Sequence, residues 1–509
     1  MAPLARLSRG RGLLKGMVAL AGTTRGIGVT LALVATALLL ATVLLHLRTA
    51  QRRFIDPDEL EHLNAASFVA QGETLYGSIF ENHPPLTTAV LQPVVRSSDD
   101  PGTILARGRL LSLAVTLATL CVVAGLGRTL AGWPGAALAP LLLSTHTFFA
   151  QKSIEVRPDV YSTFLLVLAL FALIGGLARG SWRRLVLGGV LIGLGGFFTP
   201  KIVYAAAGTV LGAVVASAPG AGVSPLRART RVLLAVGLGA GLVTAAATLE
   251  MARRGMFPGF ISDCLVVSSK MSVTDPDRFR RVLSLQTLRE NSAFWILGLA
   301  GLGVFLRLRG TALRPSGAIL GFSLVTGLAG LLHIEAPLRQ YYLTFLPQVA
   351  LSGALAFVAL LRYVGRRWSG APPWLTLALG LAACTLPPGL HLLREQPSKD
   401  RQLQVIDRVC ELSAEGERVF DCWTGLYLTR LPAYRYFYLN SDVLRLLDRD
   451  QLREGLLSSL DNPKVKVVIV DRFFEVLPVA VRARIQQEFV AVSGFPLLVR
   501  RPAGPPREQ

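Results

Sequence analysis

The stretch Ile27–Leu47 reads IGVTLALVATALLLATVLLHL and contains no Asp, Glu, Lys or Arg. About 20 consecutive apolar residues allow a helix to cross the roughly 30 Å hydrocarbon core of a bilayer. This stretch therefore predicts a membrane-spanning helix near the N-terminus. Its apolar run is longer than that of a cleaved signal peptide, and no clear small-x-small cleavage site follows it. We expect it to be a retained first span.

Similar apolar runs recur through most of the 509 residues, of which 52% are hydrophobic and 17% charged. Soluble globular proteins carry about 25% charged residues, so the composition excludes a soluble enzyme, a fibrous protein and a disordered chain. We predict a multi-pass α-helical membrane protein with about 11 transmembrane helices. The predicted spans are 27–47, 108–127, 134–150, 160–178, 185–199, 202–219, 232–250, 292–306, 316–332, 341–361 and 373–392.

The formal net charge of +21 is concentrated on one predicted side of the membrane. A basic arm (1–26) and every second connection between spans carry Lys and Arg but no Asp or Glu, whereas the rest of the chain is nearly neutral. This positive-inside pattern places the N-terminus in the cytoplasm and the C-terminus outside the cytoplasmic (inner) membrane. Because the basic residues are spread over short segments without a binding motif, we expect no nucleic-acid partner.

Three parts of the chain follow from this topology: the arm 1–26, a transmembrane domain (27–392) and an extracytoplasmic α/β domain (393–509). In the last part, hydrophobic periodicity predicts alternating helices and strands. The predicted helices are 405–412, 448–460 and 481–489, and the predicted strands are 418–422, 465–471 and 496–500. Cys410 and Cys422 both lie here, and we favour two unpaired thiols over a disulfide.

The first external loop (48–107) opens with the densest polar cluster, Phe54–His62 (FIDPDELEH). Four carboxylates within six residues repel one another unless something uses them. Pro57 favours a helix start, which would put Asp58 and His62 on one face. The functional interpretation is a general base or a divalent-cation site formed by Asp58, Glu59 and His62. The alternative is a helix N-terminus enriched in acids by the helix dipole. The sequence demands no metal or other cofactor.

Other external loops add charged or aromatic candidates. His83 precedes two prolines that fix an extended backbone near the membrane surface, although a simple turn would have the same sequence. Arg157 and Asp159 stand between apolar spans, where charges pair or face a cavity; Asp159 could also be an N-cap. Arg339 is a candidate phosphate ligand beside Tyr341, and a plain interfacial anchor is the alternative.

In this order the motifs resemble the GT-C class of membrane glycosyltransferases, especially bacterial relatives of protein O-mannosyltransferases and aminoarabinose–lipid A transferases. That class carries an Asp-Glu pair, an A-x₅-G segment and a Pro-Pro-Leu element in its first external loop. The corresponding segments are Asp58-Glu59, Ala66–Gly72 and His83–Leu86. An Arg-Pro-Asp in the next external loop matches Arg157–Asp159, and a late Arg-Tyr matches Arg339–Tyr341 with one residue inserted.

The resemblance implies transfer of a sugar from a polyprenyl-phosphate donor to a lipid, glycan or protein acceptor outside the cytoplasmic membrane. It implies an inverting reaction with Asp58 as general base, and with Glu59 and Asp159 orienting the acceptor or holding a cation. Further substrate- or phosphate-binding candidates are His62, His83, Arg157, Lys201, Arg339 and Tyr341. Two positions depart from the class, which commonly has an aromatic residue at His62 and a lysine at His83.

Two other functions fit a multi-pass protein. A lipid or glycan transporter or flippase usually has polar groups near the bilayer midplane and repeated halves. Here the predicted spans contain few charges, and the polar groups gather on one side. This distribution favours chemistry on a lipid headgroup. An assembly protein that kept the fold and lost activity would have the same sequence pattern.

Overall fold

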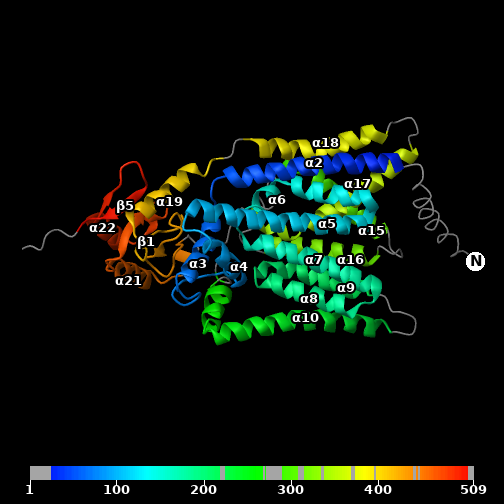
Figure 1. The fold of residues 1–509 in the computed structure, drawn as a ribbon. Helices are drawn as coiled ribbons and strands as arrows, with labels where there is room; N and C mark the ends of the chain where they lie inside the picture. The colour runs from blue at the N-terminus through cyan, green and yellow to red at the C-terminus, as the bar shows by residue number, and fades with distance from the viewer. Residues whose placement is uncertain are drawn as a thin grey trace, which may run out of the picture.

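The computed structural model describes residues 25–217, 224–267, 270, 289–307, 314–333, 338–367, 373–394, 397–439, 443–444 and 447–502. The predicted arm 1–26 and the end of the chain beyond Pro502 therefore lie almost entirely outside the described residues. Long helices run side by side through most of the molecule, and a small α/β domain lies at one end (Figure 1). Among the described residues, six helices are long and apolar enough to cross a membrane.

The helical bundle confirms a multi-pass membrane protein and follows the predicted spans closely. Its helices are α2 (Arg25–Arg52), α5 (Pro101–Thr145), α7 (Pro158–Arg179), α8 (Trp182–Gly196), α9 (Val203–Ala216), α10 (Pro225–Arg253), α15 (Ser292–Arg307), α16 (Arg314–His333), α17 (Leu346–Arg367) and α18 (Pro373–Leu393). The predicted span 341–361 starts too early, since Arg339–Thr344 form a separate 3₁₀ helix, η3. Pro347 lies in the first turn of α17, where its missing N–H costs nothing.

Helix α5 contains two of the predicted spans, joined at Gly132. This glycine has a φ of 72°, a conformation that side chains disfavour. A Cβ placed on Gly127 would lie 2.3 Å from the carbonyl oxygen of Gly135. In a continuous helix these two residues would be about 12 Å apart along the axis. The chain therefore reverses at Gly132, and the two arms pack closely through glycines.

The end of the bundle next to the α/β domain holds short helices from the loops that carry the predicted motifs (Figure 1). These are α3 (Pro57–Ala70), α4 (Leu86–Val95), α6 (Thr147–Lys152), η1 (Pro200–Ile202), α11 (Phe257–Gly259) and the π-helix η2 (Phe260–Val267). The opposite end carries the basic connections, such as the one between α7 and α8. The motifs and the basic connections are therefore separated by the length of the bundle.

The C-terminal domain is built on a five-stranded sheet with the order β2-β1-β3-β5-β4. Strand β1 pairs in parallel with β2 and β3, whereas β5 is antiparallel to β3 and β4. The elements are α19 (Asp400–Leu412), β1 (Arg418–Phe420), β2 (Leu431–Pro432), α21 (Arg449–Leu460), β3 (Val465–Ile469), η4 (Phe474–Val476), α22 (Val479–Glu488), β4 (Phe489–Ala491) and β5 (Leu497–Arg500). All six predicted elements are present, and the α/β interpretation is confirmed.

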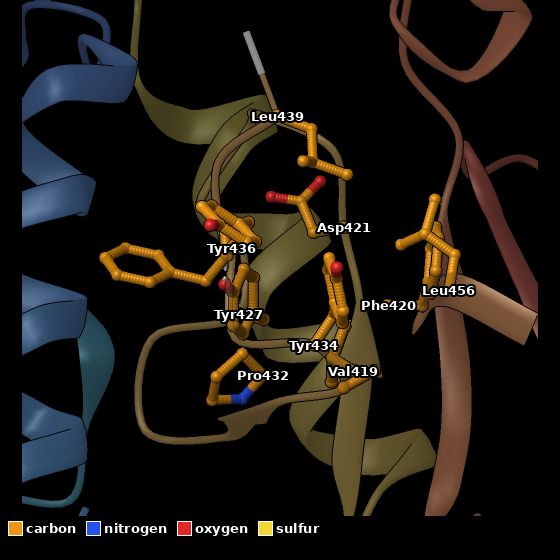
Figure 2. Close-up of a pocket in the computed structure, with 11 residues that line it drawn as sticks. Val419, Phe420, Asp421, Tyr427, Pro432, Tyr434, Tyr436, Leu439 and Leu456 are labelled. Atoms are coloured by element: carbon orange, nitrogen blue, oxygen red, sulfur yellow. Dashed lines mark hydrogen bonds between the residues drawn. The ribbon is translucent and has the colours of Figure 1, made fainter. Parts of the chain in front are cut away.

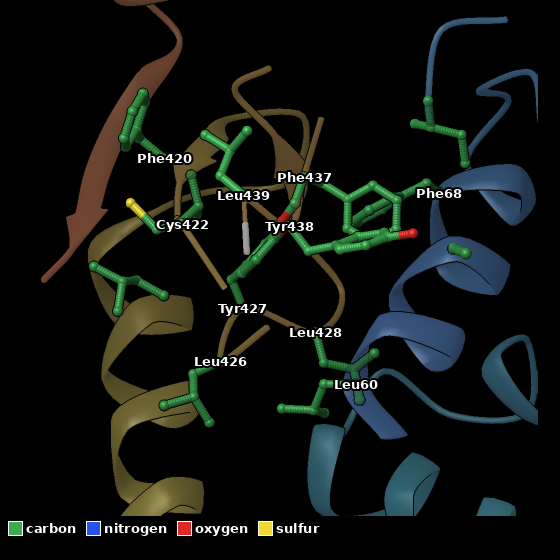
Figure 3. Close-up of a cluster of buried hydrophobic side chains, with 14 of the residues drawn as sticks. Leu60, Phe68, Phe420, Cys422, Leu426, Tyr427, Leu428, Phe437, Tyr438 and Leu439 are labelled. Atoms are coloured by element: carbon green, nitrogen blue, oxygen red, sulfur yellow. The ribbon is translucent and has the colours of Figure 1, made fainter. Parts of the chain in front are cut away.

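Aromatic packing joins this domain to α3. The ring of Phe68 lies 5.2 Å from that of Phe437 and 6.0 Å from that of Tyr427. Figure 3 shows Leu60 and Phe68 of α3 facing the aromatic cluster of the C-terminal domain. The Asn64 amide donates to the carbonyl oxygen of Gly425 at 2.9 Å. One buried core thus fixes the position of α3 relative to the domain.

The cysteines form no disulfide. All five are free, and Cys410 and Cys422 are the two in the C-terminal domain. The prediction of unpaired thiols is confirmed. The domain is instead stabilised by its apolar core, which includes Val467 and Val468 of β3 at 0% exposure.

Candidate active site

The site begins at the N-terminus of α3, where the sequence Asp-Pro-Asp-Glu starts the helix. The Asp56 carboxylate accepts from the Asp58 N–H at 3.2 Å, and the Glu59 carboxylate accepts from the Asp56 N–H at 3.1 Å. This is a capping box, and Pro57 at the first position has no N–H to satisfy. The predicted helix start is confirmed. The side chains of Asp56 and Glu59 make the capping contacts, whereas the Asp58 side chain pairs with Arg157.

Arg157, at the N-terminus of α7, gathers three carboxylates. Its Nη1 lies 2.6 Å from Asp58 Oδ2 and its Nη2 lies 2.9 Å from Asp56 Oδ2, while Nε pairs with Glu155. Arg157 is 2% exposed. Burial opposes its charge, but the surrounding carboxylates outweigh burial and raise its pKa well above the ordinary value. The guanidinium is therefore a fixed positive charge that joins the two external loops.

Lys152 and Arg53 complete this network. The Lys152 ammonium lies 2.8 Å from Asp56 and 2.9 Å from Glu155, and Arg53 Nη1 lies 2.7 Å from Glu155. Burial raises the pKa of Asp56, but the charges of Arg157 and Lys152 outweigh it and lower the pKa far below its ordinary value. The charges of the 151–159 loop thus pair with one another and with Asp56 and Asp58, whereas Asp159 Oδ1 has no hydrogen-bond partner among the described residues.

Glu59 faces away from this network and is 0% exposed. Its two oxygens lie 2.7 and 2.9 Å from Nη2 and Nε of Arg109, and one also accepts from the Val156 N–H at 3.2 Å. A bidentate pair of this kind fixes both side chains. In this structure Glu59 holds α3 against α5 and the 151–159 loop.

Asp58 and Asp159 are brought close to Lys201, which belongs to η1. Burial opposes the charge of Lys201, but Tyr341, Asp159 and Asp58 outweigh it and raise the lysine pKa. Its ammonium lies 3.8 Å from the centroid of the Tyr341 ring. The Asp58 side chain is 27% exposed, and Asp159 Oδ1 is buried without a hydrogen-bond partner among the described residues. Two carboxylates therefore lie within electrostatic range of one cation, and Asp159 has unused acceptor capacity.

Arg339 lies two residues before Tyr341 in η3 but takes another direction. It is exposed, and its guanidinium lies 5.2 Å from the centroid of the Phe148 ring. Arg339 is therefore linked to Lys201 only through their common neighbour Tyr341, and among the described residues it forms no ion pair with Asp58 or Asp159.

His62 and His83 form a second group, with ring centroids 4.7 Å apart. His83 Nδ1 lies 2.8 Å from Glu81 Oε1 and 3.3 Å from Glu61 Oε1. Burial lowers the pKa of His83, but hydrogen bonds and charges of Glu61 and Glu81 raise it to about 10. Burial and the charge of His83 lower the pKa of His62 to about 3. One imidazole is thus positive and its neighbour neutral.

The same four side chains have the donor set of a divalent-cation site. One donor atom from each of Glu61, His62, Glu81 and His83 lies within 4.8 Å of the others. Imidazole nitrogens and carboxylate oxygens are typical zinc ligands. This group shares His62 with the predicted ligand set but leaves out Asp58 and Glu59, which pair with Arg157 and Arg109.

Several residues that build the site were not singled out from the sequence. Arg109 was the easiest to find, because a charge inside an apolar span almost always has a partner. Glu61 and Glu81 lack such a signal, since acids in external loops are usually solvated. Their role depends on how the loop 71–86 folds back on α3.

A cluster in the C-terminal domain is not part of this site. Figure 2 shows Asp421 at the end of β1 among aromatic side chains. Its carboxylate accepts from the Thr424 hydroxyl at 2.9 Å and from the Gly425 N–H at 2.7 Å. Burial raises its pKa to about 7, against these hydrogen bonds. Asp421 therefore organises the loop that docks on α3.

Comparison with known proteins connects this geometry to a family. Residues 82–245 match the family described as dolichyl-phosphate-mannose-protein mannosyltransferase. The structure of ArnT from Cupriavidus metallidurans bound to undecaprenyl phosphate has the same fold, with a TM-score of 0.60, 12% identity, and coverage of 94% of this chain and 99% of ArnT. The fold is that of the GT-C class. The resemblance inferred from the motifs is thereby confirmed, and the family match indicates a membrane glycosyltransferase.

Archaeal oligosaccharyltransferase AglB from Archaeoglobus fulgidus, in complex with an inhibitory peptide and a dolichol-phosphate, is also similar. Its TM-score is 0.53 at 11% identity, and the match covers 89% of this chain and 72% of AglB. The same enzyme in complex with Zn and sulfate matches with a TM-score of 0.52 at 14% identity. A search of curated protein sequences found no significant match.

Proposed function

We propose that the protein transfers a sugar from a polyprenyl-phosphate donor to an acceptor hydroxyl or amine at the outer face of the cytoplasmic membrane. The observation that carries this proposal is the 2.6 Å contact of Arg157 with Asp58, which joins the first external loop to the start of α7, where Asp159 lies. Lys201 lies within electrostatic range of both aspartates. Support for the donor comes from the similar ArnT and AglB structures, which hold undecaprenyl phosphate and dolichol-phosphate. The outer face follows from the positive-inside pattern.

The reaction we propose is a single displacement at the anomeric carbon. The acceptor oxygen or nitrogen forms the new bond to this carbon while the bond to the phosphate oxygen breaks. Asp58 takes the acceptor proton, and its partly exposed carboxylate is placed for this role. Asp159, with its unpartnered Oδ1, would orient the acceptor. A single displacement inverts the anomeric configuration.

The departing lipid phosphate gains negative charge and needs cations. Lys201 lies beside the two aspartates, and Arg339 is exposed nearby in η3. His83 stands where the class commonly has a lysine, and the raised pKa that Glu61 and Glu81 give it supports a positive imidazolium there. Preorganised charges at such positions stabilise the transition state more than the ground state.

A divalent cation is the alternative source of positive charge at the cluster of Glu61, His62, Glu81 and His83. A metal ion and the His83 proton would compete for the same donor atoms. Measurement of the metal content of the purified protein separates the two states. Stoichiometric zinc would assign the charge to the ion, whereas a metal-free active protein would assign it to the imidazolium.

The decisive experiment is mass analysis of cell-envelope glycans in a deletion strain. We expect a sugar to be lost and to return with the wild-type gene, but not with Asp58→Asn, because loss of a general base lowers the rate by about 10²- to 10⁴-fold. Asp100→Asn is the matched control, since Asp100 caps α5 in an exposed position. Unchanged glycans in the deletion strain would refute the function, and restoration by Asp58→Asn would refute the base assignment.

A further inference from the structure

A cavity of about 600 Å³ opens between the C-terminal ends of α2 and α18 and shares Arg53 with the ion-pair network of the candidate active site. It lies at the end of the bundle that carries the α/β domain (Figure 1). Its walls include four arginines and one acid. The charged residues are Arg48, Arg52, Arg53, Arg394 and Asp400.

The net charge of the cavity lining is positive even when the partial negative charges of the two helix C-termini are included. Each helix C-terminus contributes about half a negative charge, so two of them cancel about one guanidinium. Asp400 cancels one more. Glu155 pairs with Arg53 at 2.7 Å and cancels a further charge, so about one positive charge remains without a counter-charge among the described residues. Two arginines would be enough to cap the two helix C-termini, so the cavity has more arginines than capping requires.

Arg53 supplies a donor that the protein does not use. The side chain is 6% exposed, and its Nη1 is committed to the Gln151 carbonyl oxygen at 2.8 Å and to Glu155 at 2.7 Å. Its Nε is buried without an acceptor among the described residues. A buried N–H normally has a partner. Because this nitrogen is buried, a ligand in the cavity would meet the exposed guanidinium groups of Arg48, Arg52 and Arg394 rather than Arg53 Nε.

The surroundings of the cavity are those of a membrane surface. Leu45 and Leu393 form its apolar part. Only 11% of the most apolar window of α2 is buried inside the protein, so most of this helix faces lipid. Leu44 of α2 and Leu390 of α18 are 67% and 61% exposed. Acyl chains would contact these leucines while a headgroup reached the arginines.

We propose that this cavity binds the phosphate headgroup of an anionic phospholipid from the leaflet on the side of the α/β domain. Guanidinium groups match phosphate oxygens in geometry and charge, and the leucines match the chains. Arg53 also contacts Glu155, which pairs with Arg157, the partner of Asp58. The bound lipid would therefore support the ion-pair network of the active site from its opposite side.

The test uses the full-length protein in nanodiscs of phosphatidylcholine with and without phosphatidylglycerol. Retention of phosphatidylglycerol is measured by native mass spectrometry. We expect the variant Arg48→Gln/Arg52→Gln/Arg394→Gln to bind it about 100-fold more weakly, from about fivefold for each basic residue at an anionic surface. These arginines are exposed, so the variant should unfold at the wild-type temperature in pure phosphatidylcholine.

The matched control is Arg253→Gln/Arg254→Gln, which removes two exposed arginines at the C-terminal end of α10, on the same side of the bundle. Wild-type retention in this control would support a specific site. An equal loss in the control, or no loss in the cavity variant, would overturn the proposal. Inorganic phosphate that binds the cavity as tightly as phosphatidylglycerol would identify a soluble-anion site and overturn the lipid assignment.

Discussion

Asp58 and Glu59 are neighbours in the sequence but have different surroundings. Asp58 is partly exposed and contacts Arg157 through one oxygen, whereas Glu59 is fully buried and uses both oxygens on Arg109. An adjacent pair of acids on a helix points in directions about 100° apart, so only one can face a common pocket. The structure therefore favours Asp58 for chemistry and Glu59 for positioning.

We predict that Glu59→Gln destabilises the protein by about 3 kcal/mol, because it leaves the buried Arg109 charge without its counter-charge. Thermal unfolding of the purified protein measures this change. The control Glu475→Gln removes a pair with Arg482 in which the glutamate is 75% exposed, and should cost at most about 1 kcal/mol. Equal unfolding temperatures for Glu59→Gln and wild type would contradict the positioning role.

His83 gives a prediction with a defined pH dependence. Its folded pKa of about 10 lies above the ordinary histidine value of 6.5, so between these pH values the native state holds a proton that the unfolded chain releases. The resulting stabilisation is complete below pH 6.5 and disappears as the pH rises toward 10. The difference in unfolding temperature between wild type and His83→Gln should shrink over this range. A difference that is constant with pH would contradict a charged His83.

The same residue can be tested through activity. His83→Lys keeps a positive charge, whereas His83→Gln removes it. We expect glycan transfer to fall about 100-fold in His83→Gln, as for other lost charge-stabilising groups, and to remain largely intact in His83→Lys. The complemented deletion strain described above provides the measurement. Equal activity of the two variants would show that charge at this position is not used.

At the scale of helices, packing depends on a few glycines. A Cβ placed on Gly189 of α8 would lie 2.1 Å from the carbonyl oxygen of Val236, and one on Gly239 of α10 would lie 2.1 Å from that of Val186. These distances are far inside van der Waals contact. Helices in membranes associate through small residues of this kind, which allow their backbones to approach.

We predict that Gly189→Ala separates α8 from α10 and costs about 1–3 kcal/mol, as overpacking usually does. Gly241→Ala on α10 is the matched control, because no atom lies within 4 Å of the added Cβ. Alanine is about 1 kcal/mol better than glycine inside a helix, so the control should be neutral or slightly stabilising. Thermal unfolding in detergent compares the two, and equal effects would rule out the close contact.

The sequence alone predicted the positions of the membrane-spanning helices. It did not predict the side-chain contacts that join the ends of these helices. Apolar runs predicted the spans, and alternation predicted β3 and β5, because burial acts on each element separately. Strand β2 has two residues, too few for a periodic signal, and β4 follows α22 directly, so its residues were included in the predicted helix 481–489 or left unassigned. The pairing of Glu59 with Arg109 and the cluster of Glu61 with His83 depend on loop paths, which periodicity does not describe.

At the scale of the whole molecule, the candidate site depends on sidedness. Helices α3, α4 and α6, from the loops that carry the candidate site, lie at the end of the bundle next to the α/β domain, and the connection between α7 and α8 lies at the other end (Figure 1). The positive-inside rule assigns the basic end to the cytoplasm. A sugar carried on the outer leaflet could then reach Asp58 without crossing the bilayer.

We therefore predict opposite labelling of two single cysteines by a membrane-impermeant thiol reagent. Ser181→Cys, in the connection between α7 and α8, should react in inside-out vesicles and not in intact spheroplasts. Lys464→Cys, exposed in the turn before β3, should react in spheroplasts and not in inside-out vesicles. The wild-type protein provides the background, since four of its five cysteines are buried or partly buried and Cys121 lies within α5. Reaction of Ser181→Cys from outside would place Asp58 in the cytoplasm and exclude a donor on the outer leaflet.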